Sequence, residues 1–426
     1  MTKSVFAYRN GVLCAEALPL AEIAEEVDTP FYCTSVKQLQ RNYREFAEPF
    51  KDLDATIHYA VKANGNVAVI RTLAQCGAGA DITSAGELER ALEGGIDPKK
   101  IVFSGVGKTR DDIAAALLAG ICQINAESLS EIDLIDRVAT VLGKTAPVSI
   151  RVNPDIRAGD NAKIATGYKG AKFGIDIELL GEAVRRIVTS SSLNFNGLTV
   201  HVGSHLRNYE PFRQCYEKLA MLVGVLREQG ISVNRVDLGG GVGIPYDGQV
   251  LDPFSDYAKI VHEVIAPLGC AISFEPGRRL VGDSSVLITR VVHVKQAGDK
   301  KILIVDAGMN DLVRPAMYGS RHEIIAVREE AGAPREDVSI VGPVCETADS
   351  FGDAYSLPEL KQGDLIAIMQ AGAYGSAMSG NYNGRPLIPE VLVSAAQFAV
   401  IRRRIAVAEQ LRWESIPDWM VITRAA

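Results

Sequence analysis

An alternation of short apolar runs and helical stretches constrains the fold of this chain more than any other feature, and it repeats from Phe31 to Phe274. The apolar runs predict buried strands, and the stretches between them place apolar residues at helical spacing. Glycines such as Gly120, Gly143 and Gly230 fall where the helices should end. Eight strand–helix units of roughly thirty residues each favour a (β/α)8 barrel over an open sheet.

The elements of this predicted barrel follow one another closely along the chain. The strands are expected at Ile57–Ala63, Gly79–Thr83, Ile101–Ser104, Cys122–Asn125, Val148–Val152, Leu198–Val202, Arg235–Leu238 and Ala271–Phe274. The helices between them are expected at Ala85–Leu92, Asp111–Leu118, Leu129–Leu142, Leu179–Val188, Glu210–Glu228 and Pro253–Pro267. A further extended run, Phe31–Thr34, is interpreted as the segment that leads into the barrel.

The sequence after Arg278 has a different texture, with strand-like runs separated by Gly, Pro and Asp and few long helical patterns. The runs are Val286–Gln296, Lys301–Val305, Ile324–Val327, Val338–Val341, Asp364–Met369 and Glu390–Val400. The N-terminal residues share this texture, because Val5–Tyr8 and Val12–Cys14 flank an Asn10-Gly11 pair that predicts a hairpin turn. Both ends of the chain are therefore expected in one β domain.

The length of 426 residues agrees with two domains, since it exceeds what one hydrophobic core usually supports. We predict an α/β plus β fold in which a TIM-like (β/α)8 barrel at 30–277 is inserted into a mostly antiparallel β-sandwich or β-barrel domain. That second domain would be built from residues 1–29 and 278–426.

Composition excludes several classes of function. The net charge of −7 gives no reason to expect nucleic acid as a partner. Arg9 and Glu16 interrupt any apolar stretch at the N-terminus, so neither a signal peptide nor a membrane span is expected. The seven cysteines form no Cys-x-x-Cys pair, which favours a reducing cytoplasm, and the six histidines show no metal-binding spacing.

Candidate chemistry starts at Lys62, which ends the first predicted barrel strand. Barrels of this kind collect their active sites at the carboxyl ends of the strands. A lysine desolvated there could offer a free amine to an aldehyde cofactor as a Schiff base. The alternative is a solvated lysine at a strand end, and this segment alone does not decide between the two.

Four other predicted strands end in polar or glycine-rich segments: Asp81–Ser84, His201–Ser204, Gly239–Gly241 and Glu275–Arg278. The glycine turn precedes a helix, so its bare N–H groups could bind a phosphate, although a tight structural turn gives the same pattern. A dinucleotide-binding fold does not fit, because this turn comes late in the chain rather than after the first strand.

Glu275 and His201 complete the pattern. A carboxylate such as Glu275 can face a pyridine nitrogen and keep it protonated, and an imidazole such as His201 can lie flat against a ring. The alternatives are a surface charge and a hydrogen-bonded core histidine. Together with Lys62 and the glycine turn, these residues predict a pyridoxal phosphate site.

A longer set of motifs occurs in a specific order. It comprises Tyr59–Asn64, Lys172–Gly174, His201–Ser204, Asp237–Gly241, Glu275–Arg278, Arg314–Tyr318, Cys345-Glu346 and Ala371–Gly375. With these motifs the chain resembles the fold-type III pyridoxal-phosphate decarboxylases, which have an alanine racemase-like barrel, and among them the bacterial diaminopimelate decarboxylases. The likeness runs nearly from end to end.

The resemblance implies a role for each matching residue. Lys62 would carry the cofactor as a Schiff base, His201 would stack on its ring, and Glu275 would face the ring nitrogen. The other cofactor-binding residues, most of them at the phosphate, would be Asp81, Ser204, Gly240, Gly241, Gly277, Arg278 and Tyr374. The catalytic residues would be Lys62, His201 and Cys345.

The resemblance also implies a substrate and a partner. The family removes the carboxyl group at the D-centre of meso-diaminopimelate, which yields L-lysine and CO2 as the last step of lysine biosynthesis. Arg278, Arg314, Tyr318 and Tyr374 would bind the substrate, the arginines at its distal carboxylate. Cys345 and Glu346 would reach in from the partner subunit of a homodimer, Glu346 at the distal ammonium. Either Cys345 or Lys62 would return the proton.

Two departures from the family pattern and three other functions remain to be weighed. His205 stands where the family usually has glutamine, and Thr347-Ala348 replaces Ser-Gly, so fine specificity is open. A sibling decarboxylase for ornithine, D-lysine or a carrier-linked amino acid is the nearest alternative, and Glu346 argues against ornithine. A racemase would usually place arginine where Glu275 stands. A pyridoxal-phosphate carrier would lack the β domain that begins at Val286.

Overall fold

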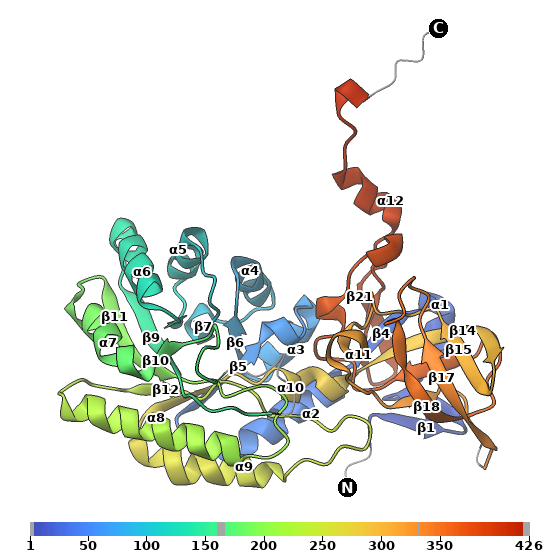
Figure 1. The fold of residues 1–426 in the computed structure, drawn as a ribbon, viewed down its shortest axis with the longest axis horizontal. Coiled ribbons are helices and arrows are strands. Elements are labelled where there is room, and N and C mark those ends of the chain that lie inside the picture. Colours follow the sequence, from blue (N-terminus) through green and yellow to red (C-terminus); the bar gives the residue numbers. More distant parts are fainter. Residues whose placement is uncertain (1–3, 160–166, 331, 421–426) are drawn as a thin grey trace. The chain divides into compact units, whose positions relative to one another are not determined.

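The computed structural model describes residues 4–159, 167–330 and 332–420. The chain separates into two compact units, which Figure 1 draws in the colours of the sequence. The barrel unit holds Ser35–Ser285 and Gln370–Ala377, and the β domain holds Met1–Thr34, Val286–Met369 and Met378–Ala426. Both chain ends therefore belong to the β domain.

Eight parallel strands form the barrel: β5 (Ala55–Ala60), β6 (Gly79–Ile82), β7 (Ile101–Phe103), β8 (Gln123–Ala126), β9 (Ala146–Asn153), β11 (Leu193–Thr199), β12 (Arg235–Asp237) and β13 (Ala271–Phe274). The sheet closes because β13 pairs with β5 and β8 pairs with β9. A short strand, β10 (Ile175–Asp176), adds to β9. The predicted (β/α)8 barrel is confirmed, and its strands follow the predicted order.

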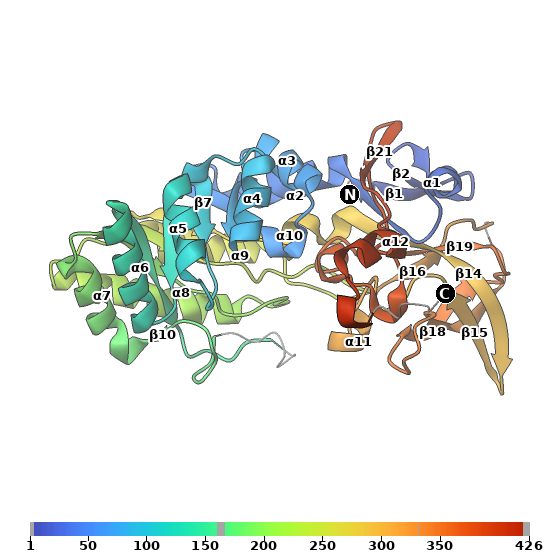
Figure 2. The ribbon, with the colours of Figure 1, turned by 90° about the horizontal axis from the view of Figure 1, so that it is seen from above.

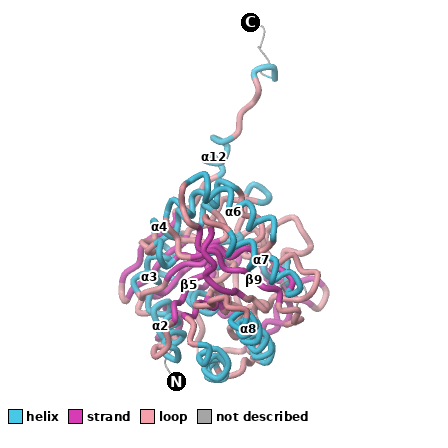
Figure 3. Tube along the Cα trace, turned by 90° about the vertical axis from the view of Figure 1, so that its left-hand side faces the viewer, coloured by secondary structure: helices cyan, strands magenta, loops and turns pink. Residues whose placement is uncertain are grey.

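The barrel helices are α2 (Val36–Ala47), α3 (Val67–Gln75), α4 (Ala85–Glu93), α5 (Arg110–Ala119), α6 (Leu129–Leu142), α7 (Leu180–Thr189), α8 (Glu210–Glu228), α9 (Phe254–Ile260) and α10 (Arg278–Val281). In Figure 3 they surround the strands. Local sequence sets their ends: Thr109 and Asp112 form a capping box at α5, and Gly120 and Gly143 end α5 and α6 in the left-handed conformation.

Three of these helices were not predicted from the sequence: α2, α3 and the short α10. Helix α2 has apolar residues at helical spacing, but they stand among Lys, Gln, Asn and Arg. Helix α3 opens with an apolar run, Val67–Ile70, which gives no helical period by itself. The predicted bounds of α6 and α8 are confirmed.

The β domain is built on a sheet in the order β18-β17-β15-β14-β4-β20-β21, with β19 also on β14 and β16 on β19. Its strands are β4 (Phe31–Ser35), β14 (Ser285–Ala297), β15 (Lys300–Val305), β16 (Ile324–Ala326), β17 (Arg335–Val341), β18 (Ser350–Pro358), β19 (Leu365–Ile368), β20 (Glu390–Ser394) and β21 (Gln397–Arg402). Figure 2 shows β14 and β15 as a long ribbon. The pair β15–β17 is parallel, within an otherwise mostly antiparallel domain.

The N-terminal part of the β domain tests two predictions. Strands β1 (Phe6–Arg9) and β2 (Val12–Ala15) pair through Arg9 and Val12, which confirms the hairpin turn at Asn10-Gly11. Phe31–Thr34 leads along the chain into the first barrel helix, as expected, but as a strand it belongs to the β-domain sheet. All residues of β4 are buried, and the strand lies between β14 and β20 of the β-domain sheet.

One short segment, Gln370–Ala377, leaves the β domain and joins the barrel unit. The Tyr374 N–H donates to the Ala63 carbonyl at 2.8 Å, and the Ala371 N–H donates to the Ser285 carbonyl at 2.8 Å. These hydrogen bonds hold Tyr374 at the rim of the barrel. In the described part of the chain, no helix has the length and apolar character to cross a membrane, and no His, Cys, Asp and Glu side chains gather as a metal site.

Candidate active site

Lys62 lies in a single 3-10 turn, Val61–Ala63, directly after β5. Its Nζ is 2.8 Å from Asp81 Oδ2, and Asp81 is fully buried in β6. Partial burial alone would lower the pKa of Lys62, but Asp81, with Tyr374 and Glu275 further off, outweighs it and holds the pKa above its ordinary value. The Schiff-base role of Lys62 stays a prediction, and in this geometry the amine forms an ion pair with Asp81.

Asp81 has a second oxygen that faces no protein donor. Among the described residues, Asp81 Oδ1 is buried and has no hydrogen-bond partner. A buried carboxylate oxygen without a donor is costly, so this atom marks a place where a polar group of a ligand fits. The place lies beside the Lys62 ammonium, at the carboxyl ends of the strands.

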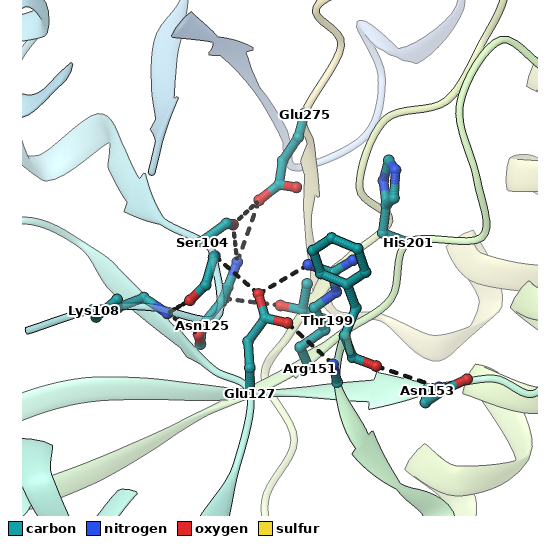
Figure 4. Close-up of polar contacts among 12 residues, drawn as sticks. Ser104, Lys108, Asn125, Glu127, Arg151, Asn153, Thr199, His201 and Glu275 are labelled. Atoms are coloured by element: carbon teal, nitrogen blue, oxygen red, sulfur yellow. Dashed lines mark hydrogen bonds and ion pairs between the residues drawn. The ribbon is translucent and has the colours of Figure 1, made fainter. Parts of the chain in front are cut away.

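Glu275 follows β13 and points into a set of polar side chains at the barrel mouth (Figure 4). Its Oε1 accepts hydrogen bonds from Ser104 Oγ at 3.1 Å and from Asn125 Nδ2 at 3.2 Å. Burial raises the pKa of Glu275 well above its usual range, and the charge of Asp237 raises it further. The charges of Lys62 and Arg151 act in the opposite direction and lower it.

Asp237 is a second buried carboxyl group, at the end of β12. It accepts from Gln123 Nε2 at 3.1 Å and from the Gly239 N–H at 3.0 Å. Burial raises the pKa of Asp237 to about 6. The sequence placed Asp237 in a motif without giving it a role, and the structure shows that its charge influences Glu275.

His201 and the glycine turn are held together by one hydrogen bond, which the Gly240 N–H donates to His201 Nδ1 at 3.2 Å. Burial, with the charges of Arg151 and Lys62, holds the pKa of His201 well below its usual range. The ring is therefore neutral, and since Nδ1 accepts, its hydrogen lies on Nε2.

The glycine turn leaves no room for side chains. A Cβ on Gly240 would lie 2.4 Å from the Glu275 carbonyl oxygen, and a Cβ on Gly241 would lie 2.4 Å from that of Gly203. Gly241 also has a φ of +112°, which disfavours other residues. Only glycine permits this close approach of the backbone.

Arg278 opens α10 directly after Gly277. Its guanidinium is buried, donates to Tyr246 Oη at 2.8 Å and to Ser204 Oγ at 3.4 Å, and lies 4.8 Å from the centre of the Tyr374 ring. The structure thus brings Ser204, Arg278 and Tyr374 together. Tyr246 was missed, because a tyrosine in a loop gives no distinctive signal in the sequence.

A network of buried ion pairs, also missed from the sequence, supports the neighbouring rim (Figure 4). Arg151 Nη1 is 2.9 Å from Glu127 Oε1, and Lys108 Nζ is 2.7 Å from Glu131 Oε1. Glu127 also accepts from the N–H groups of Gly105 and Gly174. An arginine inside the apolar strand Val148–Val152 was the available signal, because a charge buried in a strand needs a partner.

Two predicted substrate-binding residues lie in the β domain. Arg314 and Tyr318 begin and end the short helix α11 (Arg314–Tyr318). Arg314 is buried, with Nη1 at 2.9 Å from His322 Nε2 and Nη2 at 3.3 Å from Ser320 Oγ. His322 in turn pairs its Nδ1 with the Met369 carbonyl at 2.8 Å, so the guanidinium is held in a fixed orientation.

Cys345 and Glu346 lie on an exposed loop of the β domain. The Cys345 N–H donates to Asn383 Oδ1 at 2.8 Å, and the Tyr382 hydroxyl donates to the Glu346 carboxylate. Both side chains are exposed to solvent in the single chain. Neither is held by buried neighbours, unlike Lys62 or Glu275.

Asp349 holds the loop of Cys345 and Glu346 through two hydrogen bonds to backbone N–H groups. Its two carboxylate oxygens accept from the N–H groups of Met309 and Val344, both at 2.6 Å. Burial raises the pKa of Asp349. Thr347-Ala348, the departure from the family pattern, lies inside this anchored loop.

The chemistry of the barrel site fits one kind of cofactor. A lysine amine suits an aldehyde, an unpartnered buried acceptor suits a polar ring substituent, and a buried carboxyl group suits a basic ring nitrogen. The bare glycine turn and the Arg278 guanidinium suit a phosphate. Pyridoxal phosphate carries each of these groups.

Comparison with known proteins agrees with this chemistry. A family model described as "Pyridoxal-dependent decarboxylase, pyridoxal binding domain" matches residues 36–282. The diaminopimelate decarboxylase of Zymomonas mobilis is 42% identical over 97% of this chain and 99% of its own length. That of Pseudomonas fluorescens is 44% identical over 96% and 99%. The chain belongs to the diaminopimelate decarboxylase family.

Solved structures of diaminopimelate decarboxylases have the same fold. The diaminopimelate decarboxylase of M. jannaschii superposes with a TM-score of 0.94 at 35% identity, over 98% of this chain and 99% of that one. The Helicobacter pylori enzyme, complexed with L-lysine, gives 0.89 at 38% identity, over 92% and 98%. A viral arginine decarboxylase at 22% identity shares the fold.

The resemblance drawn from the sequence is therefore confirmed. As a diaminopimelate decarboxylase family member, the chain is a carboxy-lyase, and its cofactor is pyridoxal phosphate. The individual site residues rest on the geometry described above.

Proposed function

We propose that the protein decarboxylates meso-diaminopimelate at its D-centre to L-lysine and CO2, the last step of lysine biosynthesis. The observation that carries this proposal is the Lys62–Asp81 pair beside Glu275, in a chain that matches diaminopimelate decarboxylases over nearly all its length. The H. pylori relative complexed with L-lysine supports the same product.

The barrel residues would hold and tune the cofactor. When bound, pyridoxal phosphate supplies a protonated pyridine ring that accepts the electron pair left by the departing carboxyl group. Lys62 would hold it covalently, and Glu275 would hold a proton at the ring nitrogen. Ser104 and Asn125 fix the orientation of Glu275 through their hydrogen bonds. The neutral imidazole of His201 provides a flat, uncharged surface for the ring.

The phosphate would be bound where backbone and side-chain donors meet. Asp81 pairs with Lys62 and also offers an acceptor atom to the cofactor. The phosphate-binding residues are Ser204, Gly240, Gly241, Gly277 and Tyr374, with the charge of Arg278 beside them. Removing either glycine would place a Cβ within 2.4 Å of a carbonyl oxygen.

The proton that replaces the lost carboxyl group has two possible donors. Lys62 is an ammonium beside Asp81 whenever it is not covalently engaged, so it carries a proton at the reaction centre. Cys345 is the second donor, on a loop fixed by Asn383 and Asp349. Both stay assigned as catalytic together with His201.

The distal end of the substrate would be bound by positively and negatively charged residues. Arg278 and Arg314, with the hydroxyl groups of Tyr318 and Tyr374, suit a carboxylate, since guanidinium groups bind carboxylates with fixed geometry. Glu346 suits the distal ammonium. A zwitterionic end distinguishes diaminopimelate from ornithine.

We further assign the active sites to a homodimer in which Cys345 and Glu346 enter the site of the partner subunit. Their exposure on an anchored loop supports this, because a catalytic thiol left in solvent serves no function in one chain. The described cysteines are all free, which supports a place in the reducing cytoplasm. Neither nucleic acid nor membrane enters this proposal.

The substrate is tested by measuring CO2 release from meso-diaminopimelate, L-ornithine, L-lysine and D-lysine in parallel with the cofactor-loaded enzyme. Release from meso-diaminopimelate alone, with L-lysine as product, is expected. Release from another substrate alone would keep the cofactor chemistry and overturn the roles given to Arg314 and Glu346.

The shared site is tested by mixing two inactive variants, Lys62→Ala and Cys345→Ala, under conditions where subunits exchange. If each site takes Lys62 from one chain and Cys345 from the other, a mixed dimer has one intact site. Random exchange then restores about a quarter of the activity of the unmodified enzyme. No recovery, with exchange shown by mass spectrometry, would place both residues in the site of a single chain.

A further inference from the structure

The C-terminal segment Leu411–Met420 is exposed throughout and carries several large apolar side chains. Trp413 and Trp419 are 81% and 83% exposed, and Ile416 is 72% exposed. The chain has two tryptophans, and both lie in this segment. Large apolar side chains left together in water mark an interaction site more often than single exposed residues do.

The base of the segment is firmly attached to the β domain. Asn381 Nδ2 donates to Gln410 Oε1 at 2.6 Å, and Arg403 forms an ion pair with Glu409. These bonds hold α12 (Val407–Gln410), and Gln410 itself is buried. Beyond it, Figures 1 and 3 show the segment extending without packing on a strand of its own domain. The base is therefore held by the β domain, and the apolar residues lie beyond it.

The large apolar residues of the segment recur along the chain. Trp413, Ile416 and Trp419 are three residues apart, and short helical turns occur at Leu411–Trp413 and Asp418–Met420. Between the turns, Glu414–Pro417 is not helical. The segment therefore offers its two tryptophans on two short turns, with Ile416 between them.

We infer that Leu411–Met420 is an arm that docks on a second copy of this chain. The inference rests on the proposed homodimer, because the base of the arm adjoins the loop assigned to the partner's active site. Asn381, which binds Gln410, is followed directly by Tyr382 and Asn383, which bind Glu346 and Cys345. The arm and that loop therefore begin at the same surface of the β domain.

The size of the arm agrees with this partner. A buried tryptophan removes about 150–250 Å² from solvent, so the four tryptophans of two symmetric arms would contribute about 600–1,000 Å². Stable interfaces bury about 1,200–2,000 Å² in total. Two arms would therefore supply a large part of such an interface.

The charge of the arm disfavours a membrane. Leu411–Met420 contains Arg412, Glu414 and Asp418, which is one basic and two acidic residues. Helices that lie on anionic lipid surfaces are rich in Lys and Arg instead. Docking of the arm on the chain's own barrel is the remaining possibility, and the experiment below separates it from docking on a second copy.

Intrinsic fluorescence reports directly on the arm, because both tryptophans lie in it. We expect the cofactor-loaded dimer to show blue-shifted emission and weak quenching by acrylamide, and monomers obtained by dilution to show red-shifted emission and strong quenching. Emission wavelength rather than intensity is compared, since a bound cofactor that absorbs light lowers intensity. Red-shifted, fully quenched emission in a dimer overturns the inference.

Two variants test the energetic role of the arm. The double variant Trp413→Ser/Trp419→Ser is expected to raise the dimer dissociation constant by about 30-fold or more, the effect of losing one interface hot spot or several. Val141→Ser, which changes an equally exposed apolar residue on α6, is the matched control and should leave it unchanged. Sedimentation equilibrium gives both constants, and equal constants for the double variant and the unmodified chain overturn the inference.

The remaining outcomes separate the possible partners of the arm. Blue-shifted emission in a monomer would mean that the arm packs on its own chain, and a shift seen only with phosphatidylglycerol vesicles would mean a membrane partner. Either result overturns docking on a second copy. Decarboxylase activity is assayed separately. A dimer with buried tryptophans but no activity on meso-diaminopimelate would overturn the proposed function and still support docking of the arm on a second copy.

Discussion

The two sets of candidate catalytic residues differ sharply in their surroundings. In the barrel, Lys62, Asp81 and Glu275 face one another, and hydrogen bonds to buried side chains fix them. On the β-domain loop, Cys345 and Glu346 are exposed. The residues proposed for the cofactor are thus held by the barrel itself, whereas the loop residues proposed for the distal end of the substrate lie open to solvent in the single chain.

The largest effect is expected from Lys62→Ala, which removes the covalent attachment and the proton carrier of the barrel site. Turnover should fall by about a thousandfold or more, with loss of the visible absorption band of the protein-bound cofactor. Circular dichroism and the dimer mass should stay unchanged, because Lys62 is at the rim and not in the core. Full turnover in this variant would show that Lys62 does not bind the cofactor covalently in the reaction.

Glu275→Gln sharpens the comparison within the barrel, since it keeps the size of the side chain and removes its charge. Loss of a preorganised charge at the ring nitrogen should lower kcat by about 100- to 1,000-fold while cofactor stays bound. Ser104→Ala, which removes one of the two hydrogen bonds to Glu275, should have a much smaller effect. Equal losses in the two variants would assign the effect to orientation instead of charge.

Glu346→Gln tests the exposed loop. Loss of one charge-assisted hydrogen bond should raise KM for meso-diaminopimelate by about 10- to 100-fold, and cofactor affinity should not change. Glu359→Gln, an exposed position elsewhere in the β domain, is the control. If Glu346→Gln releases the cofactor, the assignment of Glu346 to the distal end of the substrate is wrong. The proposed difference between the barrel residues and the loop residues is then wrong as well.

The last prediction concerns stability instead of activity and depends on a buried carboxyl group of the β domain. Burial raises the pKa of Asp311 to about 7. The folded chain therefore keeps a proton that the unfolded chain releases from about pH 4 upward, so the free energy of unfolding falls as pH rises from about 4 to about 7, by at most about 4 kcal/mol. Asp311→Asn should remove this part of the slope in urea unfolding curves.

An exposed carboxyl group provides the control for that measurement. Asp299 lies in the turn between β14 and β15, and Asp299→Asn should leave the slope as it is. The same slope in the Asp311 variant and the unmodified chain would show that Asp311 is not protonated in the folded state.

Strand order and the polar ends of the strands could be predicted from the sequence. The period of apolar residues changes between strand and helix, and this local signal located the eight barrel strands, whose parallel arrangement places Lys62, Asp81, His201 and Glu275 at one rim. Helix α3 escaped prediction because its first residues, Val67–Ile70, are a continuous apolar run without a helical period.

Which charges face one another was decided only by the tertiary structure. Lys62 and Asp81 are 19 residues apart, and Ser104 and Glu275 are 171 residues apart. No local sequence pattern therefore predicts either contact. The same holds for Arg151 with Glu127 and for the strand β4, which pairs with β14 and β20. Sequence periodicity is a property of neighbours along the chain, whereas pKa values and strand partners depend on residues that folding brings together.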